Sequence, residues 1–271
     1  MQPSGIITLT TDFGQTDSYV GIMKGVILGV YRAACVVDIT HAVMAQNTHQ
    51  AAYMVQTFHR FFPSGTVHVV VVDPDVGSKR RAIVLQTPEA TFVAPDNGVL
   101  TYVWRDALQR WGAAQLAAHE LTERRFWLPE VSSTFHGRDI FSPVAAHLAA
   151  GTPITALGPP IVAPVEAALE QPTIGWRGAL VGRIIHVDHF GNCITNVLPE
   201  HLEQSRMGER FTVEILEERL THLSRTYADG EVGALIALFG SSGRLELAVR
   251  NGSAARMLGV GVGDTMRVWR V

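Results

Sequence analysis

The 271-residue chain carries 22 Lys and Arg residues against 25 Asp and Glu, which gives a formal net charge of −3 at pH 7. This balance, without a dense basic run, excludes the electrostatic footprint of a nucleic-acid-binding protein, and the length suits two modest domains. No stretch approaches twenty consecutive apolar residues and no apolar signal segment is recognisable, so we expect a soluble, cytoplasmic protein without membrane contact that acts on a small molecule.

The first predicted strand, residues 6–10, leads through a turn containing Asp12 into a helix. Ser18 is an N-cap candidate for this helix, which runs to about Tyr31. Its apolar stripe consists of Val20, Met23, Ile27 and Val30. Glycines recur every four residues on another face, at Gly21, Gly25 and Gly29. Because a helical glycine costs about 1 kcal/mol relative to alanine, the three indicate a face on which another backbone packs closely, although tolerated glycines in a well-packed helix are the alternative.

A second strand and helix follow. Residues 34–39 are predicted to form the strand, and Asn47 can cap the helix, which ends before Pro63. The helical spacing is set by Ala51, Val55, Phe58 and Phe62. With the next strand, this β-α-β-α-β alternation predicts a right-handed, doubly wound, mainly parallel sheet.

The stretch from Val67 to Arg81, VHVVVVDPDVGSKRR, is the predicted organising element. Its apolar run does not alternate with polar residues, which indicates a strand covered on both faces. Pro74 ends the strand, and ligands of open α/β sheets sit beyond the carboxyl ends of the strands. We therefore expect Asp73 and Arg80 at a functional site, although a surface turn with solvated charges would have the same composition.

Residues 82–86 and 91–94 predict two strands joined by a turn, and residues 95–98 predict a tight turn before a short helix. That helix contains Val99, Val103 and Trp104.

The rest of the first half is less regular. Residues 106–130 show no clear pattern, and residues 133–139 are predicted to form a polar loop. Ser142, followed by a proline, predicts the N-cap of a helix that Gly151 ends. A Pro- and Ala-rich connection follows, and we place a linker at residues 161–176.

The last part of the chain has short β-rich runs separated by Gly, Asn and Asp turns, which predict a small β-barrel or sandwich. The runs are 180–187, 211–216, 234–239, 244–250 and 265–271. The predicted fold class is α/β, with an N-terminal doubly wound domain at 1–160 and a C-terminal β-barrel-like domain at 177–271.

Three carboxylates stand at the ends of predicted strands, namely Asp12, Asp38 and Asp73, and two histidines, His41 and His136, accompany them. A metal-dependent Asp/His hydrolase is therefore one candidate, although no HxH or HExxH motif is present. Asp12 alone could instead accept both hydroxyls of a ribose. Neither a GxGxxG nor a P-loop motif supports a dinucleotide or triphosphate.

Six motifs, in this order, resemble one enzyme family. They are TDFGQTDSYVG, VVDPDVGSKRR, APDNG, FHGRDIFSPVAAHLAAG, VDHFGN and SSGRLELAVRNGSAA. Together they are similar to the S-adenosyl-L-methionine hydrolases (adenosine-forming), also called SAM hydroxide adenosyltransferases, which are related to fluorinase and chlorinase. The similarity covers nearly the whole chain.

The resemblance implies hydrolysis of S-adenosyl-L-methionine (SAM) to adenosine and L-methionine, without a cofactor or metal, by a trimer with active sites between subunits. It assigns water activation to Asp73, Arg80 and His136. The implied substrate contacts are Asp12 to the ribose, Phe135 and Tyr227 beside the nucleoside, Asn192 to the adenine, and Ser18, Asp188 and Ser241 to the methionine end.

The halogenase relatives resemble TYPATG where this chain has VDPDVG, and FYSRE where it has FHGRD, so Asp73 and His136 favour water as the nucleophile. Two departures from the hydrolase pattern are Asp75, in place of a glycine, and Gln46, in place of an apolar or aromatic residue. The alternatives that remain are a halide-using, SAM-dependent halogenase, the metal-dependent hydrolase, and a SAM-binding module without turnover.

Overall fold

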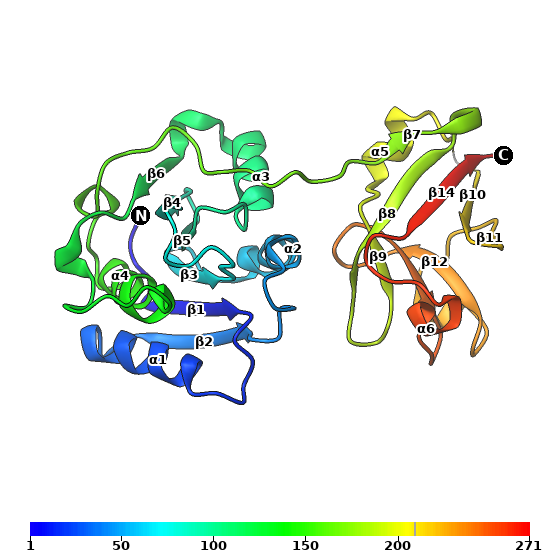
Figure 1. Ribbon diagram of the computed structural model, residues 1–271. Helices are drawn as coiled ribbons and strands as arrows, with labels where there is room; N and C mark the ends of the chain where they lie inside the picture. Colours follow the sequence, from blue (N-terminus) through cyan, green and yellow to red (C-terminus); the bar gives the residue numbers. More distant parts are fainter. Residues whose placement is uncertain (209) are drawn as a thin grey trace. The chain divides into compact units, whose positions relative to one another are not determined.

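The predicted organising strand lies inside a six-stranded sheet. The computed structural model, which describes residues 1–208 and 210–271, places β3 (Thr66–Val71) between β1 (Ile6–Thr11) and β5 (Ala90–Pro95), with all six of its residues buried. The strand order is β2-β1-β3-β5-β4-β6, with β2 at Cys35–Thr40, β4 at Ala82–Gln86 and β6 at Ala117–Glu120. β1, β2, β3 and β5 pair in parallel, whereas β4 is antiparallel to β5 and β6. The predicted mainly parallel sheet is confirmed (Figure 1).

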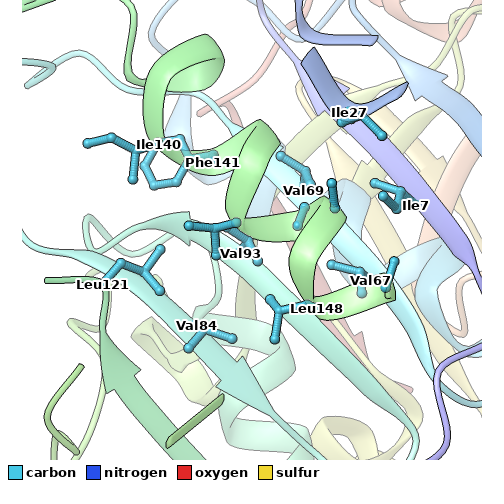
Figure 2. Packing of buried hydrophobic residues seen from close by; sticks show 14 of the residues in the cluster. Ile7, Ile27, Val67, Val69, Val84, Val93, Leu121, Ile140, Phe141 and Leu148 are labelled. Carbon is cyan, nitrogen blue, oxygen red and sulfur yellow. The ribbon is translucent and has the colours of Figure 1, made fainter. Parts of the chain in front are cut away.

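Helices cover both faces of this sheet. α1 (Tyr19–Val30) and α4 (Ser142–Ala149) pack with Val67, Val69 and Val71 of β3 in one apolar cluster, part of which Figure 2 shows. α2 (Thr48–Phe58) and α3 (Thr101–Trp111) pack with Val70 and Val72 in the other. Alternate residues of a strand face opposite sides, which explains why this run carries no polar alternation.

The two helices predicted first in the chain form at the expected places. In α1, Val20, Met23 and Ile27 are buried, but Val30 is 38% exposed, so the predicted stripe was wrong at its last residue. Ser18 stands at the N-cap without a side-chain capping bond. Asn47 does cap α2, because its side chain accepts a hydrogen bond from the backbone N–H of Gln50 at 2.9 Å.

The region that gave no pattern contains β6, which pairs with β4. The predicted loop at 133–139 and the N-cap at Ser142 were partly wrong, because a π-helical turn (Gly137–Phe141) precedes α4 and Ser142 lies inside the helical run. The Ser142 hydroxyl donates to the carbonyl of Gly137 at 2.7 Å, a bond within this turn. Short 3₁₀ segments occur at His59–Phe61, Ala113–Gln115, Arg124–Phe126, Ile154–Ala156, Trp176–Gly178 and Tyr227–Asp229.

The C-terminal part is an antiparallel, nearly closed barrel, which confirms the predicted β-barrel-like fold. Its strands run in the order β11-β10-β14-β8-β9-β13-β12, with β7 paired to β8. Their bounds are β7 Thr173–Ile174, β8 Leu180–Val187, β9 Cys193–Thr195, β10 Phe211–Ile215, β11 Glu218–Leu220, β12 Leu235–Phe239, β13 Leu245–Val249 and β14 Thr265–Arg270. Two short helices, α5 (Pro199–Gln204) and α6 (Ala254–Leu258), complete it.

Two compact units divide the chain, Met1–Ala168 and Leu169–Val271. The backbone N–H of Ile161 donates to Ala118 at 2.8 Å, so the chain after α4 stays bound to the N-terminal unit for several residues. That residues 161–176 form a linker between two domains stays a prediction. Across the described part of the chain, the helices are too short or too polar to span a bilayer.

Candidate active site

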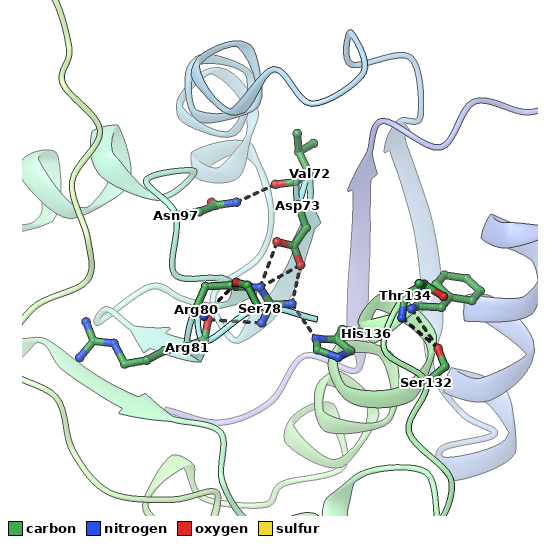
Figure 3. A network of polar contacts seen from close by, with 10 residues as sticks. Val72, Asp73, Ser78, Arg80, Arg81, Asn97, Ser132, Thr134 and His136 are labelled. Atoms are coloured by element: carbon green, nitrogen blue, oxygen red, sulfur yellow. Dashed lines mark hydrogen bonds and ion pairs between the residues drawn. The ribbon is translucent and has the colours of Figure 1, made fainter. Parts of the chain in front are cut away.

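Asp73 and Arg80 form a buried ion pair at one edge of the N-terminal sheet (Figure 3). Asp73 follows β3, and Arg80 comes just before β4, whose antiparallel direction returns the chain to the same edge. Nε of Arg80 lies 3.0 Å from both carboxylate oxygens of Asp73, and Nη2 also contacts Oδ2. The two side chains are 4% and 8% exposed, so water screens the pair little.

His136, which directly precedes the π-helical turn at Gly137–Phe141, contacts this pair. Its Nδ1 lies 2.7 Å from Nη2 of Arg80. A guanidinium only donates, so Nδ1 accepts and the ring N–H is on Nε2. Burial and the Arg80 charge lower the pKa of His136 from its ordinary value, with Asp73 and Asp139 acting in the opposite direction. The site therefore holds a neutral imidazole beside a compensated ion pair at pH 7.

Asp139 fixes the loop that carries His136. Its buried carboxylate accepts hydrogen bonds from the backbone N–H of Ser132 at 2.8 Å and from Nε of Arg138 at 2.5 Å. Burial alone would raise the pKa of Asp139, but these donors outweigh it and the pKa is lowered. The loop is thus tied to an ionised carboxylate.

Gly77 lets the two loops of the site approach each other. It has φ +79°, a left-handed conformation that favours glycine, and a Cβ built on it would lie 2.2 Å from the carbonyl oxygen of Ser133. Any side chain here would push the loop of Asp73 and Arg80 away from the loop of His136.

Asp12 follows β1 at the edge that also carries Asp73. Its Oδ2 accepts a hydrogen bond from the backbone N–H of Gln46 at 2.8 Å, whereas no bond within the described chain is found for Oδ1. Gln46 adopts a positive φ of 66°, so the residue flagged as a departure from the family pattern lies directly at this carboxylate. One oxygen of Asp12 is therefore held by the backbone while the other can accept from a ligand.

Three aromatic rings gather at Phe13, the residue that follows Asp12 in the chain. The ring centroid of Phe135 lies 5.8 Å from Phe13 and 5.2 Å from Tyr19. Ser18 is exposed and directly precedes Tyr19. The structure thus brings Asp12, Phe135 and Ser18 to one part of the N-terminal unit.

Asp38 and His41 do not join this site. Asp38 lies within β2 rather than at its end, and it binds Nζ of Lys24 at 2.5 Å and Nε2 of His41 at 3.0 Å. His41 also contacts the hydroxyl of Thr11 through Nδ1, at 2.8 Å. Because Lys24 neutralises Asp38 and Arg80 neutralises Asp73, these carboxylates are poor candidates for a shared cation, and the described residues contain no cluster of metal-ligating side chains.

The four predicted residues of the C-terminal unit line one cavity of about 910 Å³ in that unit, namely Asp188, Asn192, Tyr227 and Ser241. Asp188 shapes its rim. Oδ1 accepts from the backbone N–H groups of Phe190 and Asn192, and Oδ2 from the Asn192 side chain, each at 2.9 Å.

Glu246 in β13 is a polar residue that sequence reasoning missed. It is 5% exposed, and the hydroxyl of Tyr227 donates to its Oε1 in a short hydrogen bond. Burial raises the pKa of both groups. A glutamate inside the apolar run LELAV was the available signal, but its partner lies in a different segment of the sequence.

Comparison with known families gives two matches. Residues 7–158 match the SAM hydroxide adenosyltransferase N-terminal domain, and residues 182–267 match the C-terminal domain of the same name. Together the two matches cover most of the chain.

Individual relatives span the full length. A protein of Salinispora tropica named (R)-S-adenosyl-L-methionine hydrolase is 36% identical over 99% of both chains. A protein of Nocardia brasiliensis named fluorinase is 29% identical over 97% of this chain and 96% of its own. The crystal structure of an uncharacterized conserved protein from Thermotoga maritima has a TM-score of 0.87 at 34% identity, covering 97% of this chain and all of that one.

Proposed function

Because this chain belongs to the SAM hydroxide adenosyltransferase family, we propose that it hydrolyses S-adenosyl-L-methionine to adenosine and L-methionine. Water attacks the ribose C5′, and the sulfonium leaves as the neutral thioether of methionine. The observation that carries this proposal is the buried group formed by Asp73, Arg80 and His136.

The reaction places one main demand on the protein. A neutral thioether is a good leaving group that needs no proton, so the enzyme supplies neither a general acid nor a metal there. The weak nucleophile, water, must be positioned in line with the C5′–sulfur bond and must lose a proton as it attacks. A proton acceptor held beside a fixed positive charge, as Asp73 is held beside Arg80, can both position this water and take its proton.

Asp73 is the better proton acceptor of the two candidates. The Nδ1 lone pair of His136 is already used by Arg80, and protonation of the ring would set a second positive charge against the guanidinium. A carboxylate has about four acceptor positions, and the three contacts from Arg80 leave capacity for a water. In this proposal His136 holds Arg80 in place, Arg80 stabilises the hydroxide-like charge, and Asp73 takes the proton.

The substrate contacts are divided between the two units. Asp12 accepts the ribose hydroxyls, Phe135 flanks the nucleoside, and Ser18 contacts the methionine end from the N-terminal unit. In the C-terminal unit, Tyr227 flanks the nucleoside and Asn192 contacts the adenine. Asp188 and Ser241 take the methionine end, where the rim carboxylate suits an ammonium group. The grouping of the residues within each unit supports this assignment.

We also propose a homotrimer with active sites between subunits. A Cβ added at Gly21, Gly25 or Gly29 would meet nothing within 4 Å in the described structure beyond the helix's own backbone, and Ile22 and Leu28 beside them are 38% and 42% exposed. The close backbone contact that these glycines predict is thus left for a second copy. Sedimentation of the purified protein as a trimer, or a multiple of one, is expected, and a fully active monomer would contradict the shared site.

A cytoplasmic location is part of the same proposal. Cys35 is exposed and Cys193 is buried, and both thiols are free. Unpaired exposed thiols persist in reducing compartments. Cell fractionation with an antibody against the protein tests the location.

The decisive experiment is turnover of S-adenosyl-L-methionine in ¹⁸O-water, followed by mass spectrometry. We expect the label at the 5′-hydroxyl of adenosine and unlabelled methionine, because the new bond forms at C5′. Unlabelled adenosine would overturn the mechanism, and binding without any product would favour a binding module.

Two further conditions separate the remaining alternatives. A 5′-halogenated adenosine formed with added fluoride or chloride would favour a halogenase. Loss of turnover on chelation would favour a metal-dependent hydrolase, whereas the proposed mechanism predicts no change.

A further inference from the structure

The turn between β5 and α3, Asp96-Asn97-Gly98, is named here the DNG turn. It belongs to the motif APDNG, which the proposed chemistry does not use. The side chain of Asp96 is 1% exposed, although it carries a charge. A buried carboxylate in a tight turn requires partners, and those partners connect the turn to the reacting groups.

Asn97 holds the residue before Asp73. Its Nδ2 donates to the backbone carbonyl of Val72 at 2.9 Å (Figure 3). Val72 lies beyond the last residue of β3, where strand pairing no longer fixes the backbone. Asn97 therefore replaces the missing strand partner at the point from which the Asp73 carboxylate projects.

Asp96 holds the residue after Arg80. Its backbone N–H donates to the carbonyl of Arg81 at 3.0 Å, and its Oδ2 accepts from Nε of Arg81 at 2.7 Å. The same Arg81 carbonyl receives a long contact, 3.4 Å, from Nη1 of Arg80. Asp96 thus binds Arg81 through both its backbone and its side chain. The carbonyl of Arg81 in turn contacts the guanidinium of Arg80, which binds Asp73.

The other carboxylate oxygen of Asp96 binds the segment that follows α4, at Val165. Oδ1 accepts from the backbone N–H of Val165 at 2.6 Å. Gly98 adds a close approach, because a Cβ built on it would lie 2.7 Å from Cβ of Ala167. The DNG turn is therefore held at Val72, at Arg81 and at residues 165–167. A shift of the turn would move the end of β3 and the start of β4 with it.

We propose that Asp96 and Asn97 are positioning residues for water activation, which fix Arg80 and Asp73 from behind at the ends of β4 and β3. This inference rests on the proposed function for its kinetic consequence, but its structural part stands alone. Displacement of a reacting group by about 1 Å can lower a rate by roughly 10²-fold. The effect should appear in kcat rather than in substrate affinity, because neither residue is among the substrate contacts proposed above.

Two selective variants test the proposal. Asp96→Asn keeps an oxygen for Val165 but turns an amide donor toward Arg81. Asn97→Asp keeps the oxygen that accepts from Val99 and removes the donor to Val72. Each should lower kcat by about 10-fold or more, with the calorimetric Kd for S-adenosyl-L-methionine within about threefold of wild type.

A matched control is Glu166→Gln. Glu166 ties the same segment to α3 through an exposed ion pair with Arg105 at 2.6 Å, without contact to Arg81 or Val72. It should leave kcat within about twofold. Equal losses in the control and in the DNG variants, or wild-type kcat in the folded DNG variants, would overturn the proposal.

A second readout separates this inference from the proposed function. ¹⁵N NMR of the labelled His136 ring, assigned by its absence from His136→Ala, reports the hydrogen bond from Arg80 to Nδ1 without any turnover. Asp96→Asn should shift this resonance, and Glu166→Gln should not. If the wild type forms no adenosine but the shift is seen, only the proposed function fails. If the shift is absent, the positioning role fails.

Discussion

The N-terminal and C-terminal units organise their polar side chains in different ways. In the N-terminal unit, Asp73 and Arg80 are 4% and 8% exposed and bind each other and His136. In the C-terminal unit, Tyr227 is 45% exposed at a cavity of about 910 Å³, and Asp188 there is held mainly by backbone N–H groups of its own turn. The first arrangement makes Asp73, Arg80 and His136 depend on one another, whereas the second consists of separate local contacts, Asp188 with its own turn and Tyr227 with Glu246. Chemistry and binding should therefore respond differently to mutation.

The largest effect is expected in the mutually bound group. Asp73→Ala and His136→Ala should each lower turnover by about 10²-fold or more, the scale of general-base assistance, with substrate affinity little changed. The double variant should be only slightly worse, because the residues act as a unit. Single-turnover kinetics and calorimetry measure both quantities. Full turnover by His136→Ala, or a loss in the double variant equal to the sum of the two single losses, would show that these side chains do not act as a unit.

Asp12 gives an intermediate case, since the backbone holds one of its oxygens and leaves the other free. Asp12→Ala should weaken binding of S-adenosyl-L-methionine by roughly 1.5–3 kcal/mol, the range for hydrogen bonds to charged groups. Turnover at saturating substrate should fall by a much smaller factor than the affinity does. The matched variant Asp12→Asn, which keeps an oxygen, should lose less affinity than alanine. Unchanged calorimetric affinity for Asp12→Ala would remove this residue from the substrate site.

In the C-terminal unit, the Tyr227–Glu246 pair should affect stability more than chemistry. Tyr227→Phe leaves the buried Glu246 carboxyl without its donor, which should lower the free energy of unfolding by about 1–3 kcal/mol. Adding Glu246→Gln removes the charge and should recover part of the loss. Urea unfolding measures both variants. A double variant that is less stable than Tyr227→Phe would contradict the account.

Acid should act with opposite signs on two buried histidines of the N-terminal unit and on Glu246 of the C-terminal unit. Burial lowers the pKa of His59 to about 4 and of His68 to about 3, whereas it raises the pKa of Glu246. Between pH 6.5 and about 4 the unfolded histidines bind protons that the folded ones do not, so stability present above pH 6.5 is lost as the pH falls, by about 1.4 kcal/mol per pH unit for each histidine. The folded Glu246 instead binds its proton at higher pH than the unfolded one, so acid favours folding around it.

Hydrogen exchange at pH 7 and pH 5, resolved along the chain, tests this difference. Protection should fall more in β3 of the N-terminal unit than in β13 of the C-terminal unit. His68→Asn should reduce the loss, and the matched control His49→Asn, at an exposed position, should not. Equal losses of protection in both strands would contradict the assignment to the buried histidines.

The sequence predicted those parts of the fold whose signals are local. The unbroken valine run of β3 and the Asn47 cap each depend on neighbouring residues, and both formed as expected. β6 was missed because its four residues include His119 and Glu120 and lack an apolar pattern. The π-helical turn before α4 was missed because an extra residue within a helical turn leaves no mark in composition.

For the site, topology placed Asp73 from the sequence alone, because the carboxyl ends of parallel strands meet at one edge. The grouping of His136 with Arg80 came only from the family resemblance, since the two residues are 56 positions apart in the chain. Asp38 was placed at a strand end, but it lies within β2, and its pairing with Lys24 depends on how α1 packs. The assigned roles of the substrate-binding residues stay predictions.

The antiparallel direction of β4 also bears on how the active site assembles. β3 and β4 are separated by β5, a gap of roughly 10 Å at the usual strand spacing, which an extended arginine side chain helps to cross. Only residues 74–79 separate Asp73 from Arg80, so joining the pair closes a short loop, and the entropy lost in closing a loop grows with its length. A parallel β4 would have needed a crossover of a dozen or more residues. The ion pair can therefore form early and locally during folding, and substrate meets a charge arrangement that is already complete.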